Sequence, residues 1–362
     1  MDRNFVVKAH LMCDGIKVDE KATEYLNNMS PIWLMNDYIT CTGVTLVFAN
    51  QYATADVNPE SKFTLTSDGD DLYIIDDKGE SFLTKAITPP DYMKDEIWIE
   101  GKSITTYVNT YTDRVRIRLL SGCANACKFC NAVECEYEFN SITGLDTALQ
   151  IALSQSKVRH GLLSSGNAKT PDDIERLTDM YKFFTQKYKD LDIDLMTPPR
   201  GFRGYKEEHE YEAYLKYVKE IGVYGISTNI ELNSPEYLQR YCKEKADVGQ
   251  RRYLDFIEKA VDIFGKNYVR SLIIVGLEPL EETLKGVEKL AKIGCNPVLS
   301  PLFPYGEAVG FRSPELFIEA RERSEEICDK YNIKLGPVCV PGLRTKSWTL
   351  KFVVSRLFCP QK

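Results

Sequence analysis

Histidine is scarce in this sequence: its 362 residues include only His10, His160 and His209. This leaves few imidazoles for a histidine-based metal site. Basic residues are also in the minority, since 46 lysines and arginines stand against 53 aspartates and glutamates and leave a net charge of −7. A nucleic-acid-binding domain usually has a basic surface, so we expect no nucleic-acid partner.

Long apolar runs are absent as well. The longest runs, such as residues 272–276, are too short to cross a bilayer. The first ten residues, MDRNFVVKAH, have no apolar core of the kind found in secretory signals. We therefore expect a cytoplasmic protein that contacts no membrane.

Cysteine, in contrast, is plentiful: the chain has 11, and three of them are crowded into GCANACKFCNA at residues 122–132. Most cysteines of a cytoplasmic protein are small buried hydrophobes, but a polar loop is a poor place to bury thiols. Cys123, Cys127 and Cys130 suit neither a structural zinc site, which takes four ligands, nor a redox disulfide, which needs two thiols. A [4Fe–4S] cluster usually takes four cysteines, so three would leave one iron without a protein ligand. An open position of this kind is a catalytic signature.

The first hundred or so residues indicate a small strand-rich domain. A short helix is predicted over residues 21–27, and turn signals such as SDGDD and DDKGE separate short β-prone runs. The predicted strands are residues 43–48, 62–66, 71–75 and 96–99. We assign residues 1–110 to an N-terminal strand-rich α+β domain.

Over residues 111–335 strands alternate with helices, which indicates a parallel sheet with helices outside it. The predicted strands are residues 115–120, 160–164, 193–196, 224–229, 268–275 and 297–300. The predicted helices are residues 145–156, 172–187, 208–221, 250–264, 280–293 and 314–331. Six such units predict an α/β fold with a partial (β/α)6 barrel of the TIM type, and residues 336–362 are expected to form a C-terminal tail covering the barrel. In such folds ligands bind at the carboxyl ends of the strands, and the cysteine loop directly follows the first strand.

The cysteine loop resembles the signature of the radical S-adenosylmethionine (radical SAM) superfamily, which is CxxxCxΦC after the first strand of a βα barrel. Here the pattern is made by Cys123, Cys127, Phe129 and Cys130. The resemblance spans residues 110–335, and the barrel resembles the biotin synthase-like branch. It implies that three thiolates hold three irons of a [4Fe–4S] cluster while S-adenosylmethionine (SAM) chelates the fourth. Reductive cleavage of SAM then gives a 5′-deoxyadenosyl radical that abstracts hydrogen from a substrate, with electrons from a low-potential donor of the flavodoxin or ferredoxin type.

The resemblance also implies cofactor-binding residues at the ends of later strands. After the second strand the family has a glycine-rich stretch whose backbone binds the amino group of SAM. The corresponding residues here are SSG, so the resemblance implies the backbone contact but not the side-chain contact. On the fourth strand alternating polar side chains share one face and are expected to meet the ribose and methionine ends of SAM. The fifth strand resembles the adenine-binding strand of the family, and an arginine beyond the fourth strand often contacts the SAM carboxylate. The implied set is Phe129, Ser164, Ser165, Gly166, Ser227, Asn229, Glu231, Arg252, Gly276 and Glu278.

The substrate is indicated less specifically. Arg200 after the third strand, and Tyr305 and Glu307 after the sixth, are expected at the same rim, where an arginine can clamp a carboxylate or a phosphate. We expect a small-molecule substrate and a biosynthetic or rearrangement reaction. Scattered cysteines such as Cys339 and Cys359 leave open a sulfur-inserting or auxiliary-cluster enzyme of the biotin or lipoyl synthase type. A non-enzymatic iron–sulfur sensor or electron carrier is the other open alternative.

Overall fold

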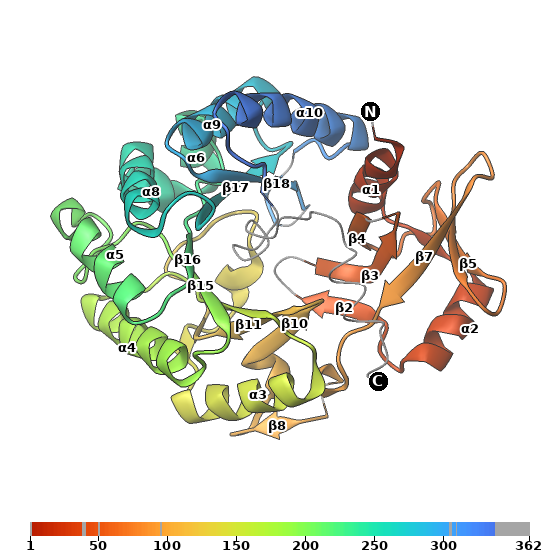
Figure 1. Ribbon diagram of the computed structural model, residues 1–362, viewed down its shortest axis with the longest axis horizontal. Helices are drawn as coiled ribbons and strands as arrows, with labels where there is room; N and C mark the ends of the chain where they lie inside the picture. The colour runs from red at the N-terminus through yellow and green to blue at the C-terminus, as the bar shows by residue number, and fades with distance from the viewer. Residues whose placement is uncertain are drawn as a thin grey trace.

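The computed structural model describes residues 2–37, 41–49, 51–94, 96–303, 306–308 and 310–336. Two sheets of seven strands each organise this part of the chain. The first sheet belongs to an N-terminal unit, and the second curls into an incomplete ring that helices surround (Figure 1).

The N-terminal unit packs two helices against the first sheet, whose strand order is β1-β5-β6-β7-β3-β2 with β4 paired to β3. Its helices are α1 (Arg3–Asp14) and α2 (Glu20–Met29). Its strands are β1 (Lys17–Val18), β2 (Leu34–Asp37), β3 (Cys41–Phe48), β4 (Gln51–Ala55), β5 (Thr64–Ser67), β6 (Leu72–Ile75) and β7 (Ser81–Ile87). A short hairpin of β8 (Trp98–Ile99) and β9 (Lys102–Ser103) follows. The predicted helix and the predicted strands are present here, whereas the sequence did not indicate α1, β2, β4 or β7.

The second sheet has the order β10-β11-β14-β15-β16-β17-β18. Only the pair β10–β11 is antiparallel, and the other five pairs are parallel. The strands are β10 (Val108–Tyr111), β11 (Arg114–Arg118), β14 (His160–Ser164), β15 (Asp192–Met196), β16 (Gly225–Ser227), β17 (Val269–Val275) and β18 (Asn296–Pro301). The expected six parallel strands of a partial barrel are therefore confirmed.

Helices follow the parallel strands and cover the outside of the ring (Figure 1). They are α3 (Ile142–Gln155), α4 (Pro171–Lys187), α5 (Tyr211–Glu220), α6 (Pro235–Tyr241), α7 (Lys243–Val248), α8 (Gln250–Phe264), α9 (Leu280–Lys292) and α10 (Pro314–Lys330). Several predicted boundaries differ from the structure. β11 ends at Arg118 rather than at residue 120, β16 covers only Gly225–Ser227 rather than residues 224–229, and α3 begins at Ile142 rather than at residue 145. A 3-10 turn over Glu208–Glu210 precedes α5. The short helices α6 and α7, between β16 and α8, were not predicted.

The strands turn alternate side chains to the helices and to the inside of the ring, as pleated strands must. On β11, Val115 and Ile117 belong to the large apolar core that includes Leu145 of α3 and Leu177 of α4. The intervening positions of β11 are all arginine, so this strand presents an apolar outer face and a cationic inner face. The core therefore lies between the sheet and its helices, and the inside of the ring is more polar.

The N-terminal unit contacts both edges of the open ring. On one side α1 packs on α10, where the ring centroids of Phe5 and Phe317 are 6.1 Å apart. On the other side Thr112, in the turn between β10 and β11, hydrogen-bonds the hydroxyl of Tyr52 on β4 at 3.1 Å. Figure 1 shows β2, β3 and β4 facing the gap between β10 and β18. The N-terminal unit thus stands where further strands would complete the barrel.

The sheet changes between β7, which ends at Ile87, and β10, which begins at Val108. The domain boundary expected near residue 110 remains a prediction, and most of the tail expected over residues 336–362 lies outside the described residues. In the part of the chain that is described, we found no helix with the length and apolar character needed to span a membrane.

Candidate active site

The cysteine loop leaves the barrel at the carboxyl end of its first parallel strand. β12 (Leu120–Ser121) pairs with β13 (Glu138–Phe139), which closes the chain between them into a loop. The loop turns at Gly122, whose φ of +67° favours glycine. An added Cβ there would lie 2.8 Å from the carbonyl oxygens of Cys135 and Glu136. The three cysteines therefore lie at the edge of the sheet where parallel α/β folds bind their ligands.

Cys123 is held by backbone groups from the segment that follows β14. Its sulfur accepts N–H hydrogen bonds from Asn167 at 3.1 Å and from Asn125 at 3.4 Å. Gly166 packs so closely on the loop that an added Cβ would lie 1.7 Å from the carbonyl oxygen of Gly122. Burial raises the pKa of the Cys123 thiol, while the two N–H groups favour its thiolate. The predicted SSG segment is therefore next to the cysteine loop and supports it directly.

The other two thiols of the loop contact an apolar cluster. Cys127 is 8% exposed and belongs to a cluster with Leu232 and Leu277, and Cys130 packs against the same cluster. A hydrogen bond between the sulfurs of Cys127 and Cys242 lowers the pKa of Cys127 and raises that of Cys242. Burial raises the pKa of Cys130 to about 11. No sequence pattern indicated that a fourth thiol, Cys242, lies beside this loop.

Ser227, Asn229 and Glu231, expected on one face of the fourth strand, lie at and beyond the end of β16, which stops at Ser227. The hydroxyl of Ser227 donates to the amide oxygen of Asn229 at 3.1 Å, and the same oxygen accepts the N–H of Leu272 at 3.3 Å. Glu231 has a φ of +64°, a strained conformation for this residue type that tends to occur at functional sites. Its backbone bridges to Ile273 of β17, which holds the strained turn in place.

Lys245 on α7 is a site residue that the sequence did not indicate. Its ammonium group donates to Glu231 at 2.9 Å and to the carbonyl oxygen of Asn229 at 3.0 Å. Both members of the Lys245–Glu231 pair are nearly buried, with side chains 13% and 12% exposed. Burial is the largest single influence and works to lower the pKa of Lys245, but Glu231, Tyr253 and the nearby cysteines together raise the pKa overall. The positive charge also acts on Cys127, so this ion pair and the cysteine loop form one electrostatic environment.

The remaining residues predicted near the first two strands lie close to the loop. Ser164 is buried and its hydroxyl accepts a hydrogen bond from Arg116 at 3.1 Å. Ser165 is half-buried and precedes Gly166. Phe129 is half-buried against the apolar cluster of Cys127. Because the hydroxyl of Ser164 already accepts a hydrogen bond from Arg116 of β11, a cofactor would have to bind the same hydroxyl in addition.

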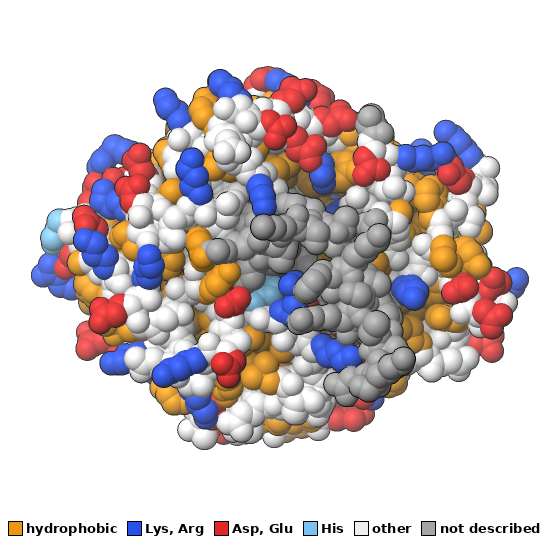
Figure 2. Space-filling model, in the orientation of Figure 1, with side chains coloured by type: hydrophobic (Ala, Val, Ile, Leu, Met, Phe, Trp, Pro, Cys, Tyr) orange, Lys and Arg blue, Asp and Glu red, His pale blue; other side chains and the backbone are white. Residues whose placement is uncertain are grey.

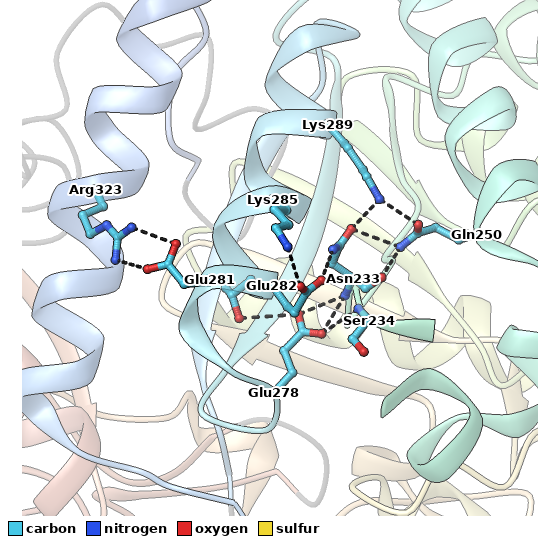
Figure 3. A network of polar contacts seen from close by, with 10 residues as sticks. Asn233, Ser234, Gln250, Glu278, Glu281, Glu282, Lys285, Lys289 and Arg323 are labelled. Atoms are coloured by element: carbon cyan, nitrogen blue, oxygen red, sulfur yellow. Dashed lines mark hydrogen bonds and ion pairs between the residues drawn. The ribbon is translucent and has the colours of Figure 1, made fainter. Parts of the chain in front are cut away.

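Gly276 and Glu278, predicted to bind the adenine, have structural roles in the described chain. Gly276 has a φ of +101°, and an added Cβ would lie 2.1 Å from the carbonyl oxygen of Phe311. The carboxylate of Glu278 accepts the backbone N–H groups of Asn233 and Ser234 at 2.8 to 3.1 Å, immediately before α6 begins (Figure 3). Burial raises the pKa of Glu278, and these N–H groups oppose the shift. Glu278 therefore holds the two residues that lead into α6, and a cofactor contact of its side chain remains a prediction.

The predicted arginines do not lie at the exposed rim. Arg200 is 0% exposed, and its guanidinium donates to the hydroxyls of Thr197 at 2.7 Å and of Tyr181 on α4 at 3.3 Å. Arg252 donates to Glu208 at 2.7 Å, in the outer layer between α5 and α8. Both guanidinium groups therefore donate to oxygens of the protein, those of Thr197 and Tyr181 for Arg200 and that of Glu208 for Arg252.

Of the two site residues predicted after the sixth strand, Glu307 lies within the described part of the chain. Glu307 is exposed and pairs with Lys128 of the cysteine loop at 2.6 Å, so it lies beside that loop. Tyr305 lies outside the described residues. The substrate roles of Arg200, Tyr305 and Glu307 remain predictions.

The donor set suits an iron–sulfur cluster better than a single metal ion. Among the described residues, no three His, Cys, Asp or Glu side chains converge closely enough to hold one ion. In a cluster each thiolate binds a different iron, so wider spacing is needed. The N–H groups at Cys123 and the apolar surroundings of Cys127 and Cys130 are the contacts by which proteins tune such clusters. The three cysteines therefore fit the cluster that the sequence implies.

Comparison with known proteins gives distant relatives. No protein-family model matches the chain. A curated relative, bacteriochlorophyllide c C-7(1)-hydroxylase of Chlorobaculum limnaeum, is 30% identical over 119 residues, which are 31% of this chain and 30% of that protein. The match thus spans less than a third of the relative.

Two solved structures show how far the structural likeness extends. A radical SAM methyltransferase from Sphaerobacter thermophilus is 13% identical, with a TM-score of 0.46 over 76% of each chain. The FeFe-hydrogenase maturase HydG from Carboxydothermus hydrogenoformans is 17% identical, with a TM-score of 0.47 over 60% of this chain and 52% of that one. Of these three proteins, the one from Sphaerobacter thermophilus is named as a radical SAM enzyme.

Proposed function

We propose that this chain is a radical SAM enzyme, which uses a [4Fe–4S] cluster and SAM to act on a small-molecule substrate in a biosynthetic or rearrangement reaction. One observation carries the proposal. Three thiols of one loop lie at the carboxyl edge of a parallel barrel sheet, and the first of them, Cys123, already receives two backbone N–H groups. This arrangement provides three ligands for a cluster and leaves a fourth position for a cofactor.

In this proposal Cys123, Cys127 and Cys130 hold three irons. When bound, the cluster and SAM supply one-electron cleavage of the sulfonium and a 5′-deoxyadenosyl radical for hydrogen abstraction. The chain's own contribution is to hold the thiols in place, and it does so with the segment around Gly166 and with the apolar cluster that includes Leu232. That cluster also keeps water away from Cys127, which is 8% exposed.

The polar residues at the end of β16 are proposed to bind SAM. Ser227 and Asn229 present hydroxyl and amide groups, and Glu231 presents a carboxylate that accepts a hydrogen bond from Lys245. Because Lys245 also holds the carbonyl of Asn229, the ion pair fixes the orientation of this whole edge. We include Phe129, Ser165 and the backbone of Gly276 in the same proposal, as neighbours of the adenosine part. Electrons would come from a low-potential flavodoxin or ferredoxin.

The proposal is tested by reconstituting the protein anaerobically with iron and sulfide, adding dithionite and SAM, and measuring 5′-deoxyadenosine. We expect production of 5′-deoxyadenosine by the native chain and its loss in Cys127→Ala, because one iron loses its ligand. Cys328→Ala is the matched control, since Cys328 is a buried thiol of α10 far from the loop. Intact SAM with a fully assembled cluster would instead show an iron–sulfur carrier. About eight irons per chain rather than about four would show an auxiliary cluster.

A further inference from the structure

A fourth thiol beside the cysteine loop has no part in the proposed function. On the face shown in Figure 2, the described acidic and basic side chains are interspersed, so no patch of one charge there indicates a partner. Inside the molecule, Cys242 follows α6 directly, and its sulfur hydrogen-bonds that of Cys127. Two thiols in contact can be joined by oxidation, so this pair is a candidate redox modification site.

The backbone holds the two thiols close together. The N–H of Lys128, which follows Cys127, donates to the carbonyl oxygen of Tyr241, which precedes Cys242, at 3.0 Å. Cys127, Tyr241 and Cys242 also belong to one buried apolar cluster. A disulfide requires Cα atoms about 4.4–6.8 Å apart. The backbone hydrogen bond between the adjacent residues and the contact of the two sulfurs both favour such a separation, so the disulfide needs little backbone movement.

Burial sets the order in which the two thiols would meet an oxidant. Cys127 is 8% exposed, whereas Cys242 is 0% exposed. Hydrogen peroxide is hardly larger than water, so it would reach Cys127 first, and Cys242 would react through Cys127. In redox-sensitive proteins a second, resolving thiol commonly lies next to the first in this way.

We propose that Cys127 and Cys242 form a reversible disulfide when the chain lacks its cluster and meets a peroxide. The peroxide transfers one oxygen to the Cys127 thiol, which becomes a sulfenic acid, and leaves as water. The sulfur of Cys242 then attacks that of Cys127, so that the S–O bond breaks, the S–S bond forms and a second water leaves. The two thiols are oxidised and the peroxide is reduced. A dithiol such as dithiothreitol reverses the change by exchange.

The disulfide would keep the site in a form that can be restored. It occupies the candidate iron ligand Cys127, so no cluster can assemble until the disulfide is reduced. It also prevents further oxidation of Cys127 to the sulfinic and sulfonic acids, which is largely irreversible. The consequence for the cluster rests on the proposed function, whereas the disulfide itself rests on the contact of the two thiols.

The test uses the full chain, freed of iron by a chelator, treated with hydrogen peroxide and digested with trypsin without reduction. Trypsin cuts after lysine and arginine, so Cys127 is found in residues 119–128 and Cys242 in residues 241–243, while Cys130 falls in a separate peptide. We expect mass spectrometry to find the first two peptides linked, with the loss of two hydrogen atoms. Fragmentation should place the link on Cys127, and dithiothreitol should remove it.

Substitution shows whether Cys242 is the resolving thiol. In Cys242→Ser we expect no disulfide at Cys127, and instead a sulfenic acid that persists and is labelled by dimedone on residues 119–128. Cys328→Ser is the matched control, because Cys328 is a buried thiol of α10. This variant should form the disulfide as the native chain does.

The peptide map of the native chain is decisive even if Cys242→Ser does not fold. A link from Cys127 to Cys123 or Cys130 in place of Cys242, or no link at all, would overturn the inference. Equal labelling by dimedone in Cys242→Ser and Cys328→Ser would overturn it as well.

Iron content separates this inference from the proposed function. We expect the reduced chain to take up about four irons and the oxidised chain few or none. A disulfide between Cys127 and Cys242 in a chain that takes up no iron even after reduction would support the thiol pair and remove the cluster. Normal iron uptake by a chain that never forms this disulfide would leave the cluster standing and overturn the inference.

Discussion

At the scale of single residues, Gly166 has a structural role that the sequence motif around it did not predict. The family resemblance makes this glycine part of a cofactor-binding backbone, and the structure shows that it also packs against Gly122 at the root of the cysteine loop. A side chain of any kind would push the two segments apart. Gly166 therefore controls whether Asn167 reaches the sulfur of Cys123.

We predict that Gly166→Ala impairs the site without unfolding the barrel. The added Cβ would lie 1.7 Å from a backbone oxygen, so the loop must shift by an ångström or more. Misplacement of that size costs roughly 100-fold in rate, which we expect in the rate of SAM cleavage. Circular dichroism and iron content should be compared with those of Gly161→Ala in the same β14 region, where the added Cβ meets only flexible side chains of Leu191 and Ile193 at 3.2 Å or more. Equal activity in the two variants would contradict the role given to Gly166.

The sequence allowed the places of the cysteine loop and of the polar residues after β16 to be predicted, because each follows a strand directly. The roles of these residues as ligands remain predictions. The sequence did not allow Lys245 or Cys242 to be predicted. Both come from the short connection before α8, and a lysine in a short polar helix normally indicates a solvated face. Only the tertiary fold brings Lys245 to Glu231 and Cys242 to Cys127.

At the scale of elements, the network around α6 shows how a strand end organises the next helix (Figure 3). Glu278 follows β17 and accepts the N–H groups of Asn233 and Ser234, the two residues before α6, while Asn233 also bonds Glu282 of α9 at 3.0 Å. α6 and α7 carry Cys242 and Lys245 at or near their ends. The contacts of Glu278 therefore help to place two residues of the candidate site indirectly.

We predict that Glu278→Ala destabilises the protein by roughly 1–3 kcal/mol for each buried N–H left without an acceptor. The free energy of unfolding in urea measures this directly. Glu281→Ala is the matched control, because Glu281 is 67% exposed and pairs with Arg323 at the surface (Figure 3). An equal loss of stability in the control would contradict a special role for the hydrogen bonds of Glu278 to Asn233 and Ser234.

The alternating strands and helices of the barrel were predictable because each helix has one apolar face toward the sheet. Helix α1 was not predictable from the sequence, because two of its faces pack against different parts of the protein. Val7 and Leu11 contact the core of the first sheet, while Phe5 and Ala9 contact α10. Apolar residues therefore alternate along the segment instead of following a helical period, and the sequence pattern indicates no helix.

At the scale of the whole molecule, the N-terminal unit and the barrel share a small core. Phe5 and Ala9 of α1 pack with Val275 of β17 and with Phe317 and Ala320 of α10. The same unit reaches the opposite edge through Tyr52 and Thr112. The stability of the open barrel therefore depends on a domain that carries none of the proposed ligands.

We predict that Phe5→Ala destabilises the protein by about 3–5 kcal/mol, as is usual for a buried phenylalanine. The loss should spread into the barrel, so the amide hydrogens of β17 should exchange faster. Phe82→Ala is the matched control, since Phe82 packs on Phe48 inside the N-terminal unit. Unchanged exchange in β17 of Phe5→Ala would mean that the two units are stable independently of each other.

The central claim is that the protein supplies three thiolates and leaves one iron for SAM. Cys242 lies beside Cys127 and could bind the fourth iron in place of SAM, which would contradict this claim. The direct measurement is Mössbauer spectroscopy of the cluster, reconstituted with isotope-enriched iron, before and after SAM is added. We predict that about one iron in four changes its signal on addition of SAM, as expected for a single iron without a protein ligand. A spectrum that SAM leaves unchanged would contradict the account.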